Sequence, residues 1–191
     1  MNEAEAVLSF WFGEPTSPEY GKSRKIWFSK DIEFDRQCRD RFLPLHEQLA
    51  AGMAREWQVE TRSCLAAIVV LDQFSRNMFR GTPRAFATDN LALELANYAI
   101  ARGFDLELLT VERGFVYLPF EHSETLDNQN RAVALFQQLA GDPDSDRSLD
   151  YAIRHREVIR RFGRFPHRND ILGRTSTPKE MEFLKQPGSR F

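Results

Sequence analysis

A run of seven apolar residues, LAAIVVL at Leu65–Leu71, constrains the fold of this chain more than any other feature. The run lies in the first half of a helical pattern that extends from Ser63, a residue type that caps helix N-termini, to Phe79. A helix that is apolar on every side must be surrounded by other elements, because any exposed face would place these side chains in water. The sequence therefore predicts a central, buried helix.

The rest of the chain has the pattern of further helices separated by glycine and proline. Pro44 is expected to begin a new helix, since proline fits the first helical turn, and Pro119 is expected to end one. Residues 142–148 (DPDSDRS) form a predicted polar loop, and no stretch has a convincing strand pattern. Helices are predicted over residues 4–11, 23–28, 31–42, 44–51, 63–79, 89–102, 112–118, 124–140, 149–162 and 178–184, with a further element starting at 82–83.

Two of these helical segments are similar to each other. DNLALELANYAIARG at residues 89–103 and DNQNRAVALFQQLAG at 127–141 begin and end alike, with an offset of 38 residues. A period in the thirties is typical of helical-hairpin solenoids, although helices that simply start and stop with the same residue types would also produce it. We predict an all-α protein in which residues 1–191 form a single helical domain.

Composition excludes several classes of function. The formal net charge is -2, so electrostatics favour neither nucleic acid nor an anionic membrane as a partner. No apolar run approaches the roughly 20 residues of a membrane span, and the acidic N-terminus does not resemble a signal peptide, so we expect a cytoplasmic protein. Cys38 and Cys64 have no metal-binding spacing and are expected to be small buried thiols.

The positive charge consists of 21 arginines and only 5 lysines. Genome composition can produce this bias, and so can recognition of anions, because the guanidinium group offers a planar fork of donors that matches phosphate and carboxylate oxygens. The positions of the arginines are therefore more informative than their number. They gather, with other polar residues, in three segments.

The first segment is LDQFSRNMFRG, residues 71–81. Asp72, Arg76 and Arg80 recur every four residues and should share one face of the central helix. They form either a structural ion pair, with Gln73 and Asn77 bonded to neighbouring loops, or the polar floor of a pocket that faces an anion.

The second segment is YLPFEHSETLDNQ, residues 117–129. Glu121 and His122 lie on the predicted break after Pro119, and Glu124 lies near the start of the next helix. Helix capping explains the polar residues that start a helix, but it does not explain an acid and a histidine on the break.

The third segment is RHREVIRRFGRFPHRND, residues 154–170, with six arginines against two acids. His155 falls on the inward stripe of the predicted helix, and Pro166 forces Phe165 out of helical geometry. The polar residues after the turn either tie the segment to the core or face a ligand. A structure in which Asp72, Glu121 and Glu124 take up every nearby arginine would refute the second alternative.

These segments supply the predicted site. His122 and His155 are candidates for acid-base catalysis, with Glu121 or another acid to orient them, and a purely structural role for the histidines stays open. Because the chain has no HExxH sequence and no histidine pair at i, i+4, we predict no metal, and without a Walker or GxGxxG loop no cofactor. The predicted ligand-binding residues are Asp72, Gln73, Arg76, Asn77, Arg80, Tyr117, Glu121, His122, Glu124, Arg161, Arg164, His167, Arg168 and Asn169.

The same segments resemble those of a known family. LDQFSRNMFRGTPRAFATD, YLPFEHSE and RFGRFPHRNDILGRTST, together with VLSFWFG and WFSKDIEFDRQCRDRF, are similar to the signature blocks of the bacterial family of unknown function DUF924. The resemblance extends from about Val7 to Leu184. It implies an α/α superhelix of helical hairpins, similar to tetratricopeptide-repeat proteins, and it implies no established activity.

Three functions are compatible with these observations. The first is binding of a small anionic molecule, bearing a phosphate or carboxylate group, in a concave pocket lined by arginine and histidine. The second is a hydrolase-like enzyme that uses a histidine-carboxylate pair in the same pocket. The third is binding of a peptide or protein along the concave face, which depends on analogy with the tetratricopeptide fold alone.

Overall fold

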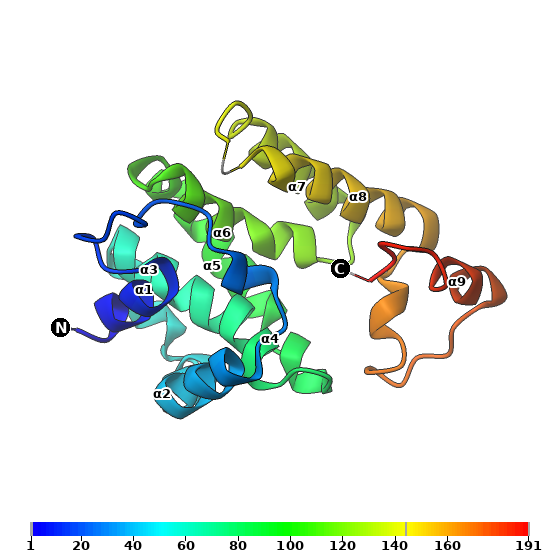
Figure 1. The fold of residues 1–191 in the computed structure, drawn as a ribbon, viewed down its shortest axis with the longest axis horizontal. Helices are drawn as coiled ribbons and strands as arrows, with labels where there is room; N and C mark the ends of the chain where they lie inside the picture. Colours follow the sequence, from blue (N-terminus) through cyan, green and yellow to red (C-terminus); the bar gives the residue numbers. More distant parts are fainter. Residues whose placement is uncertain (1, 144, 191) are drawn as a thin grey trace.

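The computed structural model of the protein describes residues 2–143 and 145–190, without the side chain of residue 146. The described residues contain no strand, which confirms the predicted all-α class (Figure 1). The α-helices are α1 (Glu3–Phe12), α2 (Ile32–Ala50), α3 (Thr61–Ile68), α4 (Ser75–Met78), α5 (Asp89–Ala101), α6 (Thr110–His122), α7 (Leu126–Gln137), α8 (Asp146–Phe162) and α9 (Pro178–Phe183). Short elements connect them: η1 (Lys25–Phe28), η2 (Met53–Val59), η3 (Val69–Phe74), η4 (Pro83–Phe86), η5 (Phe104–Glu107) and η6 (Pro166–Arg168).

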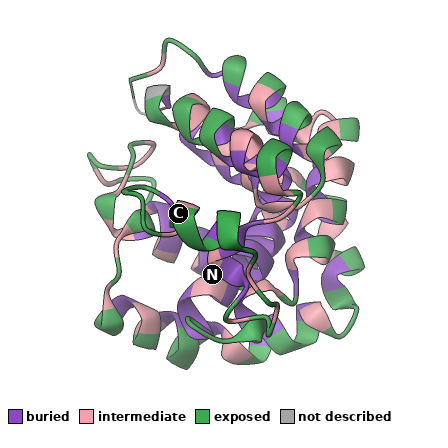
Figure 2. Cartoon of the chain, turned by 90° about the vertical axis from the view of Figure 1, so that its right-hand side faces the viewer, coloured by how far each residue is buried: buried purple, intermediate pink, exposed green. Residues whose placement is uncertain are grey.

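The predicted central helix is the axis of the fold. It consists of α3, η3 and α4 without a break, and every residue of Leu65–Leu71 is buried. Helices α1, α2, α5 and α6 pack around it, and Figure 2 shows the buried positions concentrated on the inner helices. The helix begins at Thr61, so Ser63 is not its N-cap; its hydroxyl instead donates to the carbonyl of Glu60.

Both proline predictions were wrong. Pro44 lies inside α2 and Pro119 lies inside α6, so each helix continues through a residue that cannot donate a backbone hydrogen bond. Because α6 continues to His122, Glu121 and His122 occupy its last turn instead of a break. The next helix, α7, begins at Leu126 and not at Glu124.

Other boundaries agree more closely with the predictions. Helix α8 begins at Asp146, three residues before the predicted start, and thus takes up part of the predicted loop. Residue 144 of that loop lies outside the described residues. Thr177 caps α9 through its side chain, as expected, and Cys38 and Cys64 are free and buried. Burial raises the pKa of each thiol to about 12, so both are unreactive in the folded protein.

The C-terminal residues pack on the end of α8. Helices α7 and α8 lie side by side, and η6 and α9 follow at the end of the molecule opposite α1 (Figure 1). Val158, Ile159 and Phe165 form a small apolar cluster with Phe162 and Phe183, apart from the main core. The superhelical arrangement and the single-domain organisation stay predictions. No helix in the described part of the chain is long and apolar enough to cross a membrane.

Candidate functional site

A wide helical turn carries the most buried acid of the predicted site. Residues Val69–Phe74 form a π-helical segment, in which backbone hydrogen bonds span five residues instead of four. Carbonyl groups in and near such a turn can accept side-chain donors: Leu71 accepts from Ser75 and Thr88, and Asp72 accepts from Arg76. The turn therefore holds Asp72 in the interior, with its side chain 1% exposed. Turns of this kind occur frequently at functional sites.

Asp72 orients His122. The distance from His122 Nδ1 to Asp72 Oδ1 is 2.7 Å, and because a carboxylate only accepts hydrogen bonds, Nδ1 carries the proton. Burial, followed by the charge of Arg76, lowers the pKa of His122, which favours a neutral ring. No described residue forms a hydrogen bond with the other ring nitrogen, Nε2, so its lone pair is available. A carboxylate-backed neutral imidazole of this kind can accept a proton or a hydrogen bond.

Arg76 links Asp72 to a second acid, Asp89. Its guanidinium contacts Asp72 Oδ1 at 3.3 Å and forms a bidentate pair with Asp89 at 2.9 and 3.0 Å. Burial opposes ionisation of Asp72, but Arg76 and then His122 outweigh that effect and hold its pKa below the usual range. Asp72 and Arg76 are thus a charged pair in the interior, as their four-residue spacing predicted.

Arg168 reaches Asp89 from η6, and most of its hydrogen-bond donors have no acceptor among the described residues. Its side chain is 8% exposed, and its only hydrogen bond in the described structure joins Nη1 to Asp89 at 3.4 Å. Its Nε is buried and has no hydrogen-bond partner. The rings of Phe86 and Phe165 lie 4.7 and 4.5 Å from the guanidinium carbon and hold the group in place. Burial, together with the charge of Arg76, lowers the pKa of Arg168 to about 10.

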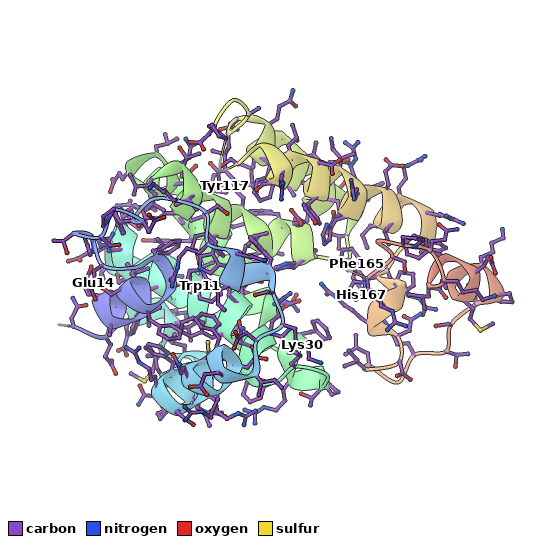
Figure 3. All side chains as sticks on the ribbon, in the orientation of Figure 1. Trp11, Glu14, Lys30, Tyr117, Phe165 and His167 are labelled. Carbon is purple, nitrogen blue, oxygen red and sulfur yellow. The ribbon has the colours of Figure 1, made fainter. Side chains whose placement is uncertain are left out.

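We call Asp72, Arg76, Asp89, His122 and Arg168 the polar junction, because it joins the central helix, α5 and α6 to η6. His167 lies beside it, and burial, followed by the charge of Arg168, lowers the pKa of His167 to about 3. Figure 3 shows Phe165 and His167 close together, between the core helices and the C-terminal part of the chain. The junction brings together four predicted ligand-binding residues, with His167 beside them.

Glu121 and His155 form a second histidine-carboxylate pair. The distance from His155 Nδ1 to Glu121 Oε1 is 3.0 Å, and both side chains are buried. The same nitrogen lies closer to the Tyr151 carbonyl, at 2.8 Å. The His155 ring also contacts the edge of Phe165, at 5.5 Å between ring centres. Since Glu121 and His122 are consecutive in a helix, their side chains diverge by about 100° and bind different partners.

Glu124 binds the segment that carries Arg168. Its carboxylate accepts a hydrogen bond from the backbone N–H of Phe165 at 2.8 Å and pairs with Arg174 at 2.6 and 2.9 Å. Burial opposes ionisation of Glu124, but the hydrogen bonds from Arg174 and Phe165 outweigh it and lower its pKa. Asn169 accepts from Arg174 Nε at 3.0 Å, so it belongs to the same group of contacts.

The other predicted residues lie outside the polar junction. Arg80 and Asn77 both bind Asp35, at 2.7 Å. Arg164 pairs with Glu180, and Arg161 lies over the rings of Phe162 and Phe183. Tyr117 donates to Asp105 within the helical body, and Gln73 donates to Asp72 at the edge of the junction.

Asp89 and Arg174 belong to the candidate site, and the sequence interpretation missed both. Asp89 was assigned only to a helix start, and Arg174 to the turn before α9. Both residues lie in the sequence segments that resemble DUF924, and this resemblance was the signal in the sequence that could have pointed to them. Arg76 and Arg174 bind acids closely, at 2.9 and 2.6 Å, whereas Arg168 has one longer contact with Asp89, at 3.4 Å, so the anion site stays a prediction.

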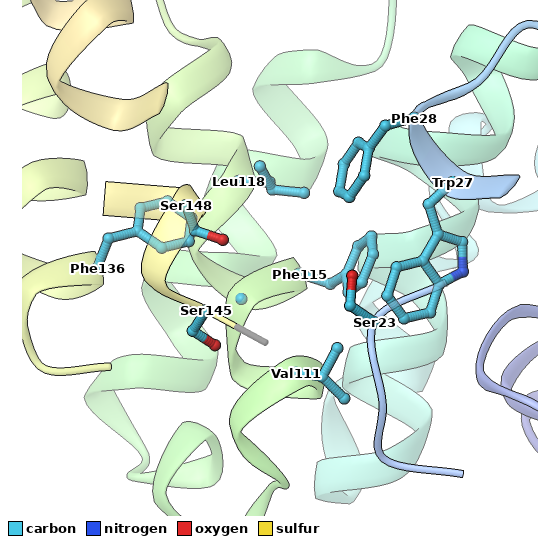
Figure 4. Close-up of a pocket in the computed structure, with 10 residues that line it drawn as sticks. Ser23, Trp27, Phe28, Val111, Phe115, Leu118, Phe136, Ser145 and Ser148 are labelled. Carbon is cyan, nitrogen blue, oxygen red and sulfur yellow. The ribbon is translucent and has the colours of Figure 1, made fainter. Parts of the chain in front are cut away.

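Two surface openings lie elsewhere. One, of about 40 Å³, has aromatic walls that include Trp27, Phe28, Phe115 and Phe136 (Figure 4). The other, of about 370 Å³, is lined by Tyr20, Arg62, Glu112 and their neighbours. Neither contains a predicted site residue. We place the candidate site at the polar junction because the hydrogen-bond donors of the buried Arg168 are incompletely satisfied there. Among the described residues, no group of three acids, histidines or cysteines could hold a metal ion.

Comparisons with known proteins agree with the fold. A family model described as "Bacterial protein of unknown function (DUF924)" matches residues 7–188. The solved structure of a protein of unknown function, ATU0120 from Agrobacterium tumefaciens, is 41% identical in sequence, with a TM-score of 0.84. The match covers 95% of this chain and 96% of that one. A comparison with curated proteins gave no match.

Proposed function

Since this chain belongs to the DUF924 family of bacterial proteins of unknown function, we propose a function from its own residues: binding of a small anionic molecule. The molecule carries a phosphate or carboxylate group, which binds at the polar junction. Arg168 is the main contact. His122 provides a directional hydrogen bond beside it.

The state of Arg168 carries this proposal. A buried guanidinium has five N–H donors, and this one has a single hydrogen bond of 3.4 Å, longer than the 2.7–2.9 Å of a good charge-assisted bond. Asp89 binds Arg76 more closely, at 2.9 and 3.0 Å, and so has little capacity left for Arg168. A buried charge without full compensation is costly, and an anion with two oxygens would compensate it.

His122 adds selectivity. Its neutral ring exposes the Nε2 lone pair, which accepts a hydrogen bond from a ligand hydroxyl or from a protonated phosphate oxygen. Arg168 contacts Asp89 and His122 contacts Asp72, and Arg76 binds both of these acids.

Thermal unfolding with a panel of inorganic phosphate, phosphorylated metabolites and carboxylates tests the proposal. A ligand that binds only the folded protein adds about 2.7 kcal/mol at 100 times its Kd, which raises Tm by roughly 5–11 °C for a chain of this length. Arg168→Gln should abolish the shift. Arg161→Gln, on the exposed side of α8, should retain it. No saturable shift with any anion would refute the proposal.

A hydrolase-like enzyme is the second candidate, and the 2.7 Å contact between His122 and Asp72 favours it. His122 Nε2 would take a proton from water, and the hydroxide would add to the phosphorus or carbonyl carbon of an ester. The ester bond would then break, and the proton would pass to the leaving oxygen. His155 lies beside Glu121 as well, but its Nδ1 is shared between Glu121 at 3.0 Å and the Tyr151 carbonyl at 2.8 Å.

Assays with phosphate and carboxylate esters separate the two candidates. His122→Gln removes the base but can still donate to Asp72, so an enzyme should lose about 100-fold or more in rate while anion binding persists. Absence of turnover with every ester that binds would leave a binding protein. Peptide binding along a concave face stays a prediction from the fold alone.

A further inference from the structure

We propose that Glu124 and Arg174 are positioning residues, which hold Arg168 beside His122 and thereby set the affinity of the polar junction for its anion. The inference deepens the proposed anion binding and rests on it. It concerns the segment 165–174, which carries Arg168 and in which Phe165, Arg168 and Asn169 are buried.

Glu124 connects this segment to the body. It lies in the link between α6 and α7, two residues after His122, so a short stretch of chain joins it to the Asp72–His122 pair. Its carboxylate accepts three hydrogen bonds from the segment: 2.8 Å from the Phe165 N–H, and 2.6 and 2.9 Å from Arg174. By comparison, the contact between Arg168 and Asp89 measures 3.4 Å and is too long to fix the segment by itself.

Arg174 closes the segment into a compact turn. Its side chain donates to the Phe165 carbonyl at 3.2 Å and to Asn169 Oδ1 at 3.0 Å, and its backbone N–H donates to the Asn169 carbonyl at 2.8 Å. One guanidinium thus binds both ends of the stretch that contains His167 and Arg168. Gly163, with φ of 68°, forms the joint between α8 and this turn.

A separate set of contacts holds α9. Arg164 forms a bidentate pair with Glu180 at 2.7 and 2.8 Å and also donates to the Thr175 carbonyl. Phe162 and Phe183 pack together beside this pair, at 5.1 Å between ring centres. Among the described residues, no hydrogen bond or ion pair joins this set to Glu124 or Arg168, although the charge of Glu124 acts on Arg164 and helps to raise its pKa. Releasing α9 from the Glu180 side should therefore leave the position of Arg168 unchanged.

The experiment compares the loss of the Glu124–Arg174 contacts with the loss of the contacts that hold α9. Glu124→Gln keeps the size of the side chain and an acceptor for the Phe165 N–H, but it removes the charge that binds Arg174. Titration calorimetry with inorganic phosphate as the probe should show a Kd weakened about tenfold or more, because the site loses preorganisation. Hydrogen exchange should increase in residues 165–174 and stay unchanged in α2–α8.

Glu180→Gln is the matched control, since it breaks an arginine-carboxylate pair in the same region without removing an arginine. Exchange should then increase around α9, while the Kd for phosphate stays within about twofold of the unaltered protein. Arg174→Lys keeps the charge without the bidentate geometry and should give an intermediate Kd.

The outcomes separate the two proposals. Unchanged Kd and unchanged exchange in Glu124→Gln would overturn the positioning role and leave anion binding intact. Increased exchange in every helix would mean general loss of stability and would overturn it as well. If the unaltered protein binds no anion, the proposed function fails. The positioning role of Glu124 is then judged from hydrogen exchange alone: an increase in Glu124→Gln that is confined to residues 165–174 supports it.

Discussion

Removal of the Asp72 carboxylate should destabilise the protein strongly, because three side chains depend on it. Asp72 is 1% exposed and accepts from His122 at 2.7 Å and Gln73 at 2.6 Å, while Arg76 lies at 3.3 Å. Removing one partner of a buried ion pair costs about 3–5 kcal/mol. Since Arg76 keeps its bidentate pair with Asp89, we expect the lower end of this range for Asp72→Ala.

Thermal and urea unfolding measure this loss. For a chain of this length, 3 kcal/mol lowers Tm by roughly 6–12 °C. Glu47→Ala is the matched control: it removes a carboxylate that pairs with Arg84 at an exposed position, where about 1 kcal/mol or less is expected. The double variant Asp72→Ala, Arg76→Met removes the buried charges together and should lose less than the sum of the single variants. If Asp72→Ala were no more costly than Glu47→Ala, the buried network would not stabilise the fold as argued.

Three further predictions concern His167, Arg168 and Gly163. Burial lowers the pKa of His167 to about 3 in the folded protein, against about 6.5 in the unfolded chain, so between these pH values only the unfolded chain binds a proton at this residue. Tm should therefore fall as pH decreases from 6.5 towards 4. In the variant His167→Gln, Tm should depend less on pH over this range. Arg168→Met should change Tm less than Arg76→Met, because Arg168 leaves only one long hydrogen bond behind. Gly163→Ala should cost about 1 kcal/mol in urea unfolding, since the backbone there has a φ of 68°.

The sequence predicted those parts of the site that depend on helical spacing. Asp72 and Arg76 pair as expected because four residues separate them within one continuous helix. Arg80 has the same spacing, yet it binds Asp35, because α4 ends at Met78 and the helical geometry no longer applies beyond that point. A four-residue spacing therefore predicts a contact only when both residues lie in the same helix.

Contacts between distant segments could not be predicted in the same way. The expected break at Pro119 would have left Glu121 and His122 without a defined direction, whereas the continuous helix sends them to His155 and Asp72 respectively. Which acid would orient which histidine was open from the sequence, since the pairing depends on how α6 packs against the central helix and α8.

Charge balance at the junction predicts which anion should bind best. The two negative charges of Asp72 and Asp89 balance the two positive charges of Arg76 and Arg168. Arg168 can still bind a ligand because Arg76 contacts both acids and leaves them little capacity for Arg168. A bound monoanion leaves the junction with one excess negative charge and a dianion leaves two, which costs more in a buried site. The monoanion of a phosphate monoester also keeps a P–OH group that can donate to His122 Nε2.

We therefore expect inorganic phosphate and phosphate monoesters to bind more tightly near pH 5.5 than near pH 8, because their second pKa lies near 6–7. Sulfate and an ionised carboxylate lack this change in charge and serve as controls, and any effect of histidine protonation should appear with them as well. The measurement is the ratio of phosphate to sulfate affinity at the two pH values, by calorimetry. A ratio that does not change with pH would show that His122 Nε2 does not receive a ligand proton, and would contradict the placement of the anion between Arg168 and His122.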